Sequence, residues 1–244
     1  MFFFQKNKSV NPDFSLFQTD MHSHLIPGID DGSPDMQTSM QLIRGMMELG
    51  FKKLITTPHI MQDIYPNTRE GILGKFNQLI SEVKSQGLDV EIKAAAEYFL
   101  DDHVASLLEN KVSLLTISGK MVLVEFSMLN PSMGLKEILF EMLMQGYVPV
   151  IAHPERYVYL ERDKDFYDEL KATGCLFQLN ILSHTGYYGK NVAELAQYLA
   201  KKNYYDLLGS DLHNVHHLKA LQHKSLVPVL NKLLESGKII NSRL

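Results

Sequence analysis

The sequence predicts an α/β protein in which parallel strands form a barrel and helices cover its outside. Short apolar runs alternate with amphipathic helical patterns along the 244 residues, which is typical of βαβ units and a parallel sheet. Histidine, carboxylate or amide side chains follow each of seven predicted strands. Parallel barrels build their sites at that end of the strands, whereas an open doubly wound sheet gathers them mainly at its switch point. The pattern therefore favours a closed or nearly closed ring of strands.

The elements are predicted in chain order from hydrophobic periodicity and from glycine caps. A first strand ends at "TDMH", and apolar residues at helical spacing over residues 36–47 predict a helix that Gly50 caps. The strand "KLITT" follows, and Gly87 closes a second helix over residues 72–83. The other strands are predicted at "EIKAAA", "MVLVEF", "VPVIA", "CLFQLN" and "YYDLLGS", and "LKEILFEMLMQG" is the clearest helix between them.

The composition is that of a globular protein, with 45% hydrophobic and 21% charged residues. We expect one domain over residues 1–244, with residues 1–15 as an N-terminal extension that is partly disordered. The net charge of −4 and the scattered lysines and arginines do not predict nucleic-acid binding. No apolar stretch is long enough for a transmembrane segment. The single cysteine is typical of a reducing compartment, so a cytoplasmic protein is expected.

The side chains that follow the strands are types that bind divalent cations. His22 and His24 are two residues apart, so their rings point to one face of the strand, and Asp211 and His213 repeat this spacing. Burying such groups without a cation would cost on the order of several kcal/mol each. Nitrogen and oxygen ligands without thiolate favour manganese, iron, zinc or magnesium. The predicted metal ligands are His22, His24, Asp31, His59, Glu97, Glu125, His153, Asp211 and His213.

These nine ligands exceed what one ion needs, so two or three ions are expected, and a carboxylate such as Glu97 can bridge a pair. Asp30 and Asp31 alternate in direction, and we expect only one of them to reach the metals. Asp35 is expected to be a capping or first-turn carboxylate of the helix that follows. Neighbouring divalent ions can clamp the attacking and the leaving oxygen of a phosphoryl transfer, which indicates phosphate ester chemistry.

The motifs "DMHSHLIPGIDDG", "ITTPH", "AAAEYF", "LVEF", "IAHPERY", "LNILSHTGYYG" and "GSDLHN" occur in this order between residues 20 and 214. With them the chain resembles the PHP (polymerase and histidinol phosphatase) phosphoesterases, and within these the bacterial manganese-dependent protein-tyrosine phosphatases of the CpsB/YwqE type. The resemblance implies a distorted seven-stranded (β/α) TIM-like barrel, the PHP fold, with three metal ions. The implied ligand sets are His22, His24, Glu97 and Asp211 for one ion, Glu97, Glu125 and His153 for a second, and Asp31, His59 and His213 for a third.

The resemblance also implies the reaction. The chain would be a phosphoric monoester hydrolase that uses Mn²⁺ to hydrolyse phosphotyrosine on a bacterial tyrosine autokinase, which controls capsule or exopolysaccharide synthesis. Arg156 of "HPER" would bind the phosphate with its planar guanidinium, and Asp31 or His59 would assist proton transfer. Relatives often carry a further arginine after the last motif. This chain reads "HNVHHLKAL" there, so a residue among His216, His217 and Lys219 could replace it.

Two other functions stay open from the sequence. One is a PHP phosphatase of a small molecule such as histidinol phosphate, or a related metal-dependent hydrolase, and the other is a catalytically inactive metal-binding adaptor of the kinase. A cysteine phosphatase is excluded, because Ile181 stands where its loop needs an arginine six residues after Cys175. Cys175 lies in an apolar strand and is expected to be buried. Glycine loops of the ATP- and NAD-binding types are also missing.

Overall fold

The computed structural model describes residues 11–130 and 133–244. Of the predicted N-terminal extension, residues 11–15 belong to this structure, and residues 1–10 lie outside the described residues. Phe14 is fully buried and stacks on Phe51 with 4.9 Å between the ring centroids. The last part of the extension therefore packs into the core.

Every pair of hydrogen-bonded strands is parallel, as the alternating pattern predicts. One sheet has the order β1-β2-β4 and the other the order β3-β5-β6-β7-β8-β9. The first sheet consists of β1 (Thr19–Asp20), β2 (Lys53–Thr56) and β4 (Glu91–Ala94). The second consists of β3 (His59–Ile60), β5 (Glu97–Phe99), β6 (Met121–Glu125), β7 (Val148–Ala152), β8 (Leu176–Asn180) and β9 (Tyr205–Gly209). The chain thus has an α/β fold with parallel sheets.

Two of the predicted strands, β2 and β4, are each followed, after an interruption of two residues, by a further short strand. β2 and β3 are separated by residues 57–58, and β4 and β5 by residues 95–96. Pro58 has no N–H to donate to a ladder, which weakens strand pairing at this point. The two interruptions lie side by side, because the N–H of Ala95 donates to the carbonyl of Thr56 at 2.8 Å. Each interruption comes directly before a predicted metal ligand.

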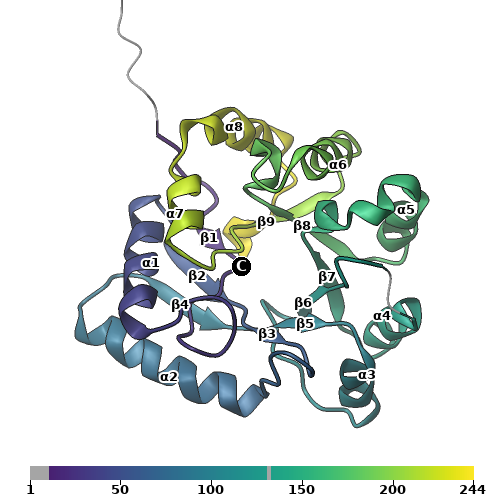
Figure 1. Ribbon diagram of the computed structural model, residues 1–244, viewed down its shortest axis with the longest axis horizontal. Coiled ribbons are helices and arrows are strands. Elements are labelled where there is room, and N and C mark those ends of the chain that lie inside the picture. Colours follow the sequence, from purple (N-terminus) through teal and green to yellow (C-terminus); the bar gives the residue numbers. More distant parts are fainter. Residues whose placement is uncertain (1–10, 131–132) are drawn as a thin grey trace, which may run out of the picture.

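The helices lie outside the strands and surround them (Figure 1). Asp35 caps the first helix as predicted, because its carboxylate accepts a hydrogen bond from the N–H of Thr38 at 2.7 Å. Thr68 caps the second helix in the same way, so that helix begins before the predicted start at residue 72. The α-helices are α1 (Met36–Glu48), α2 (Arg69–Ser85), α3 (Asp102–Glu109), α4 (Leu135–Met144), α5 (Asp165–Ala172), α6 (Lys190–Lys201), α7 (Val215–Leu221) and α8 (Val227–Ser236). Short 3₁₀ turns are η1 (Pro154–Arg156), η2 (Val158–Arg162), η3 (Ser183–Thr185), η4 (Lys224–Leu226) and η5 (Asn241–Arg243).

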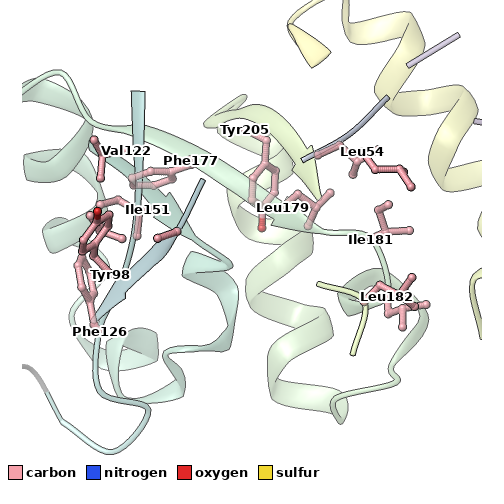
Figure 2. Packing of buried hydrophobic residues seen from close by; sticks show 14 of the residues in the cluster. Leu54, Tyr98, Val122, Phe126, Ile151, Phe177, Leu179, Ile181, Leu182 and Tyr205 are labelled. Atoms are coloured by element: carbon pink, nitrogen blue, oxygen red, sulfur yellow. The ribbon is translucent and has the colours of Figure 1, made fainter. Parts of the chain in front are cut away.

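The apolar core has two layers, because successive side chains of a strand point to opposite faces. Val122 of β6, Ile151 of β7 and Phe177 of β8 belong to the layer between the strands and the helices, where Figure 2 shows them close together. Leu123 of β6 belongs to a smaller inner cluster. Glu125 stands two residues beyond Leu123 in β6, on the same face, so it points toward the interior at the end of the strand. The inner cluster comprises Met21, Ile55, Ala95, Ile117, Leu123, Val150, Ala152 and Leu207.

The end of β9 lies beside the chain that follows β1. The N–H of Asp211 donates to the carbonyl of His22 at 2.8 Å, and the N–H of His24 donates to the carbonyl of Leu212 at 2.9 Å. These hydrogen bonds join the segment after β9 to the segment after β1. They also place two of the predicted ligand motifs next to each other.

The C-terminal segment packs against the opposite end of the strands. The Asn241 side chain accepts a hydrogen bond from the N–H of Leu208 and donates one to the carbonyl of Thr19, both at 2.8 Å. Ile240 and Leu244 pack against the inner cluster. In Figure 1 the C-terminus therefore lies in the middle of the ring of helices.

Candidate metal centre

A first group of predicted ligands, His22, His24, Glu97 and Asp211, is buried at the ends of three strands. Nε2 of His22 lies 3.0 Å from Oε2 of Glu97 and 3.3 Å from Oδ1 of Asp211. Nε2 of His24 lies 3.4 Å and 3.5 Å from the same two oxygens. Four ligand atoms from distant parts of the chain therefore surround one point, in the set that the resemblance implies for one ion.

Glu97 also belongs to a second group, with His59 and Glu125. Nδ1 of His59 lies 2.8 Å from Oε1 of Glu125 and 3.4 Å from Oε2 of Glu97. His153 lies near the other carboxylate oxygen of Glu97, with its Nε2 3.2 Å from Oε1. This group differs from the set implied by the resemblance, because it contains His59 in place of His153. Glu97 therefore belongs to both the first and the second group.

The third group contains Asp31, His59 and His213, together with His24. Nε2 of His59 and Nε2 of His213 each lie 3.4 Å from Oδ1 of Asp31. The rings of His24 and His213 stack with 3.9 Å between their centroids. The Asp31 side chain is 51% exposed, so this group opens to solvent. The sequence spacing does not reveal that His24 and His59 each face two groups.

The backbone at two of the ligands is left-handed. His153, directly after β7, has φ of 33°, and Asp211, shortly after β9, has φ of 52°. Residues other than glycine rarely adopt this conformation, which costs about 1–3 kcal/mol. It turns both side chains away from the alternation of the preceding strand and toward the ligand groups. Such strain is concentrated at functional sites.

Two glycines give the ligand rings room. A Cβ at Gly32 would lie 2.3 Å from Cβ of His24, and a Cβ at Gly209 would lie 2.6 Å from Cβ of His22. Neither distance is compatible with van der Waals contact, so any larger residue would displace a ring. The glycines of "DDG" and "GSD" are therefore part of the site.

Asp30 contacts two of the predicted ligands, His24 and His59. Its Oδ2 lies 2.8 Å from Nδ1 of His24 and accepts a hydrogen bond from the N–H of His59 at 3.2 Å. Asp31 belongs to a group of possible ligands, and Asp30 does not. Partners of this kind orient a metal-binding imidazole and fix its tautomer.

Gln178 holds two further ligands, and the sequence analysis missed it. Its Oε1 lies 3.0 Å from Nδ1 of His22 and accepts a hydrogen bond from the N–H of His153 at 3.1 Å. Gln178 stands two residues before Asn180 in β8, so both side chains are on the same face. A polar residue on the inner face of an otherwise apolar strand was the signal that could have identified it.

The charges of the cluster result from mutual contact that outweighs burial. Burial lowers the pKa of His59, but Glu97, Asp31 and Glu125 raise that pKa to about 10. Burial raises the pKa of Glu97, but His22 and His59 hold it well below its usual range. Without a cation, mutual contact therefore favours the charged forms of His59 and Glu97.

Several atoms of the cluster still lack a hydrogen bond. Among the described residues, the buried atoms without a well-aligned hydrogen bond include Nδ1 of His59, Oε1 of Glu97, Oε1 of Glu125 and Nδ1 of His153, although the first three lie within 3.2 Å of an ion-pair atom. An unsatisfied buried polar atom costs about 1–3 kcal/mol. A divalent cation would occupy the lone pairs of His59, Glu97 and Glu125 at once. The groups of histidine and carboxylate side chains are therefore able to hold metal ions.

Arg156 stands beside these groups on η1. Its Nη1 donates to Oδ2 of Asp211 at 2.8 Å, and its guanidinium lies 4.5 Å from the centroid of the Tyr188 ring. The side chain is 26% exposed and lines a cleft of about 500 Å³ together with His59 and His213. A phosphate in this cleft would meet both the guanidinium and the open side of the ligand groups.

Asn180 connects the arginine to the ligands. Its Nδ2 donates to Oδ2 of Asp211 at 3.1 Å and to the hydroxyl of Tyr188 at 3.2 Å. Oδ2 of Asp211 is thus occupied by Asn180 and Arg156, which leaves Oδ1 facing His22. Asn180 follows the strand-end pattern but positions other side chains and belongs to none of the ligand groups.

Tyr188→Leu is expected to lower kcat/KM for a phosphate monoester by about 2- to 30-fold, because the lost cation–π contact of ~0.5–2 kcal/mol frees Arg156 from its position. Tyr188→Phe keeps the ring and should retain most of the activity. Metal content, measured by plasma emission spectroscopy, should equal that of the wild type in both variants. Equal losses of activity in the two variants would contradict a role for the ring.

Of the three residues considered as replacements for a second arginine, His217 lines the cleft. Its Nδ1 lies 3.2 Å from the carbonyl oxygen of Asp211. His216 is exposed, and Lys219 lines a separate groove between α1 and α7. His217 is therefore the one placed to contact a ligand in the cleft.

Two further expectations concern the cysteine and membranes. Cys175 is 1% exposed, and burial raises the pKa of its thiol, so it is an unreactive core residue as expected. Within residues 11–130 and 133–244, no helix combines the length and the apolar character needed to cross a bilayer.

Comparison with known proteins identifies relatives along most of the chain. Residues 18–235 match the family described as capsular polysaccharide synthesis, CpsB/CapC. The chain is 26% identical over 196 residues to the tyrosine-protein phosphatase YwqE of Bacillus subtilis, which covers 80% of this chain and 77% of the relative. It is 30% identical over 201 residues to the tyrosine-protein phosphatase CpsB of Streptococcus pneumoniae, which covers 80% of this chain and 83% of the relative.

The structure agrees with the sequence comparison. A chain from the crystal structures of YwqE from Bacillus subtilis and CpsB from Streptococcus pneumoniae, described as metal-dependent tyrosine phosphatases, matches with a TM-score of 0.78 and 26% identity over 88% of this chain and 86% of that chain. A lactonase from Listeria monocytogenes has a TM-score of 0.54 at 13% identity, covers 95% of this chain and 92% of its own, and is similar in fold alone. The resemblance indicated by the motifs is confirmed, and the chain belongs to the CpsB/CapC family of capsular polysaccharide synthesis proteins.

Proposed function

We propose that this protein is a metal-dependent protein-tyrosine phosphatase. The observation that carries the proposal is the cleft itself, where His59 and His213 of the ligand groups and the guanidinium of Arg156 face one space of about 500 Å³. The tyrosine phosphatases YwqE and CpsB, to which the chain is similar in sequence and structure, support the same reaction.

We infer that the cofactor is Mn²⁺ and that three ions bind. One ion would be held by the first group, a second by Glu97, Glu125 and His153 with His59 close by, and a third by Asp31, His59 and His213. Imidazole and carboxylate ligands without thiolate suit manganese, and also iron, zinc or magnesium. Divalent ions bound there would supply positive charge for the phosphate and would activate water at neutral pH.

The residues of the cleft would then bind the phosphate, contact the aromatic ring and assist proton transfer. Arg156 binds two phosphate oxygens through its planar fork, and Tyr188 and Asp211 hold that fork in place. Met61 and Tyr65 line the same cleft and give the aromatic ring of the substrate an apolar wall. A phenolate, with a pKa of about 10, leaves with little help from an acid. Asp31 or His59, at the open group, would assist proton transfer.

The proposed substrate is the phosphotyrosine of a bacterial tyrosine autokinase that regulates capsule or exopolysaccharide synthesis in the cytoplasm. The family to which the chain belongs is described by capsular polysaccharide synthesis, which supports this choice. A peptide-borne phosphotyrosine needs an open site, and the cleft is open, since Asp31 and Arg156 are partly exposed.

We further infer that the chain is one PHP domain built on a distorted seven-stranded barrel. In this view β2 with β3, and β4 with β5, are each one interrupted strand. The hydrogen bonds between the segments after β1 and β9 would close the ring. The lactonase similarity supports a barrel-like arrangement of this kind.

The decisive experiment compares a phosphotyrosine peptide with histidinol phosphate as substrates of the manganese-loaded protein. We expect kcat/KM to be more than about tenfold higher for the peptide, a difference of ~1.4 kcal/mol in transition-state free energy. Treatment with a chelator should abolish turnover, and added Mn²⁺ should restore it. Preference for histidinol phosphate would favour the small-molecule alternative. Kinase binding without metal-stimulated hydrolysis would favour the adaptor.

A further inference from the structure

A second cavity, of about 290 Å³, lies between α6, α8 and the start of β9. It shares no lining residue with the cleft that contains Arg156. Figure 1 shows α6 and α8 as neighbours in the outer ring, and the exposed Lys201 and Lys232 in the lining place the cavity at the surface. Its volume is close to the lower limit of small-molecule sites, which are about 300–1,000 Å³.

One part of this cavity is apolar. Tyr205, Val229, Leu233 and Ile239 belong to its lining. The Tyr205 ring is buried, and its hydroxyl donates to Oε2 of Glu155 at 3.0 Å, so the ring forms a fixed wall. Leu233 is also buried. An apolar body in contact with these side chains would be removed from water, which is favourable.

The rest of the lining is positively charged. Lys201, Lys232 and Lys238 line the cavity, and the lining contains no aspartate or glutamate. Among the described ion pairs, none involves these three lysines, although the whole chain has a net charge of −4. Burial and the nearby Lys232 lower the pKa of His184, which also lines the cavity, to about 4. Uncompensated positive charge beside an apolar wall attracts anions.

We propose that this cavity is a binding site for a small organic anion with an apolar body. Tyr205, Val229 and Leu233 receive the apolar body, and Lys201 and Lys232 bind the anionic head. Sulfonate, carboxylate and phosphate heads share the required chemistry. The site is separate from the cleft that holds the phosphatase chemistry, so its occupation needs neither Arg156 nor metal.

The test uses naphthalene-1-sulfonate as the probe and naphthalene-1-sulfonamide, of the same shape but uncharged, as its match. Titration calorimetry of the metal-loaded protein should show the sulfonate binding more than about tenfold more tightly than the sulfonamide. Binding of the two compounds within about twofold of each other would overturn the role of the lysines. Absence of binding heat at millimolar sulfonate would overturn the site.

Variants of the lining lysines test whether the sulfonate binds in this cavity. Lys201→Glu combined with Lys232→Glu should weaken sulfonate binding by more than about tenfold, because two attractive charges become repulsive. Both lysines are exposed, so the double variant should fold and keep the activity of the wild type. Lys190→Glu, at an exposed position outside the cavity, is the matched control and should bind normally. Unchanged binding in the double variant, or loss of binding in Arg156→Ala, would assign the probe to another place and end the proposal.

Discussion

Replacing His22 and His24 together by alanine is expected to remove bound metal and to lower phosphatase kcat/KM by far more than 100-fold. Both Nε2 atoms face the same oxygens of Glu97 and Asp211, so the double variant keeps only the carboxylates of the first group. Loss of a residue that only hydrogen-bonds to a metal ligand already costs about 10–100-fold in metal affinity or activity. Loss of two direct ligands should cost more, and Glu97 would no longer hold the first and second groups together.

The measurement combines metal analysis of the purified variant with a phosphotyrosine peptide assay. Circular dichroism shows whether the fold is intact, since a collapse of the structure would also remove metal. His103→Ala combined with His223→Ala is a matched control, because neither residue belongs to a ligand group. A folded His22/His24 variant that retains metal and full activity would refute the assignment of these two residues.

The second large effect is expected for Arg156→Ala, which should lower kcat/KM by about 10²- to 10³-fold while metal stays bound. The expected magnitude is that of removing one preorganised donor from a developing negative charge. Metal should stay because Asn180 still donates to Oδ2 of Asp211, and Oδ1 of Asp211 still faces His22. Arg156→Lys should recover only part of the activity, because an ammonium lacks the planar fork.

This prediction is checked by steady-state kinetics on the phosphotyrosine peptide together with metal analysis. Arg162→Ala provides the control, since that arginine is exposed on η2 and does not line the cleft. An Arg156→Ala variant without metal would mean that the arginine supports the ligand groups and does not bind phosphate. Activity equal to the wild type would exclude both roles.

Much of the fold could be predicted from local patterns. Short apolar runs predict β6, β7, β8 and β9 within a few residues of their observed bounds. Asp35 caps α1, in agreement with its position before the helical pattern. The interruptions at residues 57–58 and 95–96 could not be predicted, because they depend on how two neighbouring strands pair. The C-terminal segment was equally unpredictable, since Ile240 and Leu244 have no periodicity that indicates packing on the inner cluster.

The candidate site also combines features that the sequence predicts with features that only the tertiary structure shows. All nine predicted ligands could be named from the sequence, because imidazole and carboxylate groups follow apolar runs, and parallel strands of a barrel gather such groups at one end. The tertiary structure alone decides which ligands face one another. His59 belongs to two groups. Asp30 contacts the ring of His24, and Gln178 contacts the ring of His22. His153 and Asp211 have a left-handed backbone, which directs their side chains toward the groups.

The sequence by itself determined the chemical types of the candidate site, namely which imidazole, carboxylate and guanidinium side chains follow which strands. Only the tertiary structure decided the distances between them, the positioning of Arg156 by Tyr188 and Asp211, and the presence of a separate lysine-lined cavity. The physical reason is that residue type and periodicity are local properties of the chain. Distances between strands depend instead on sheet register and on packing between segments that are far apart in sequence.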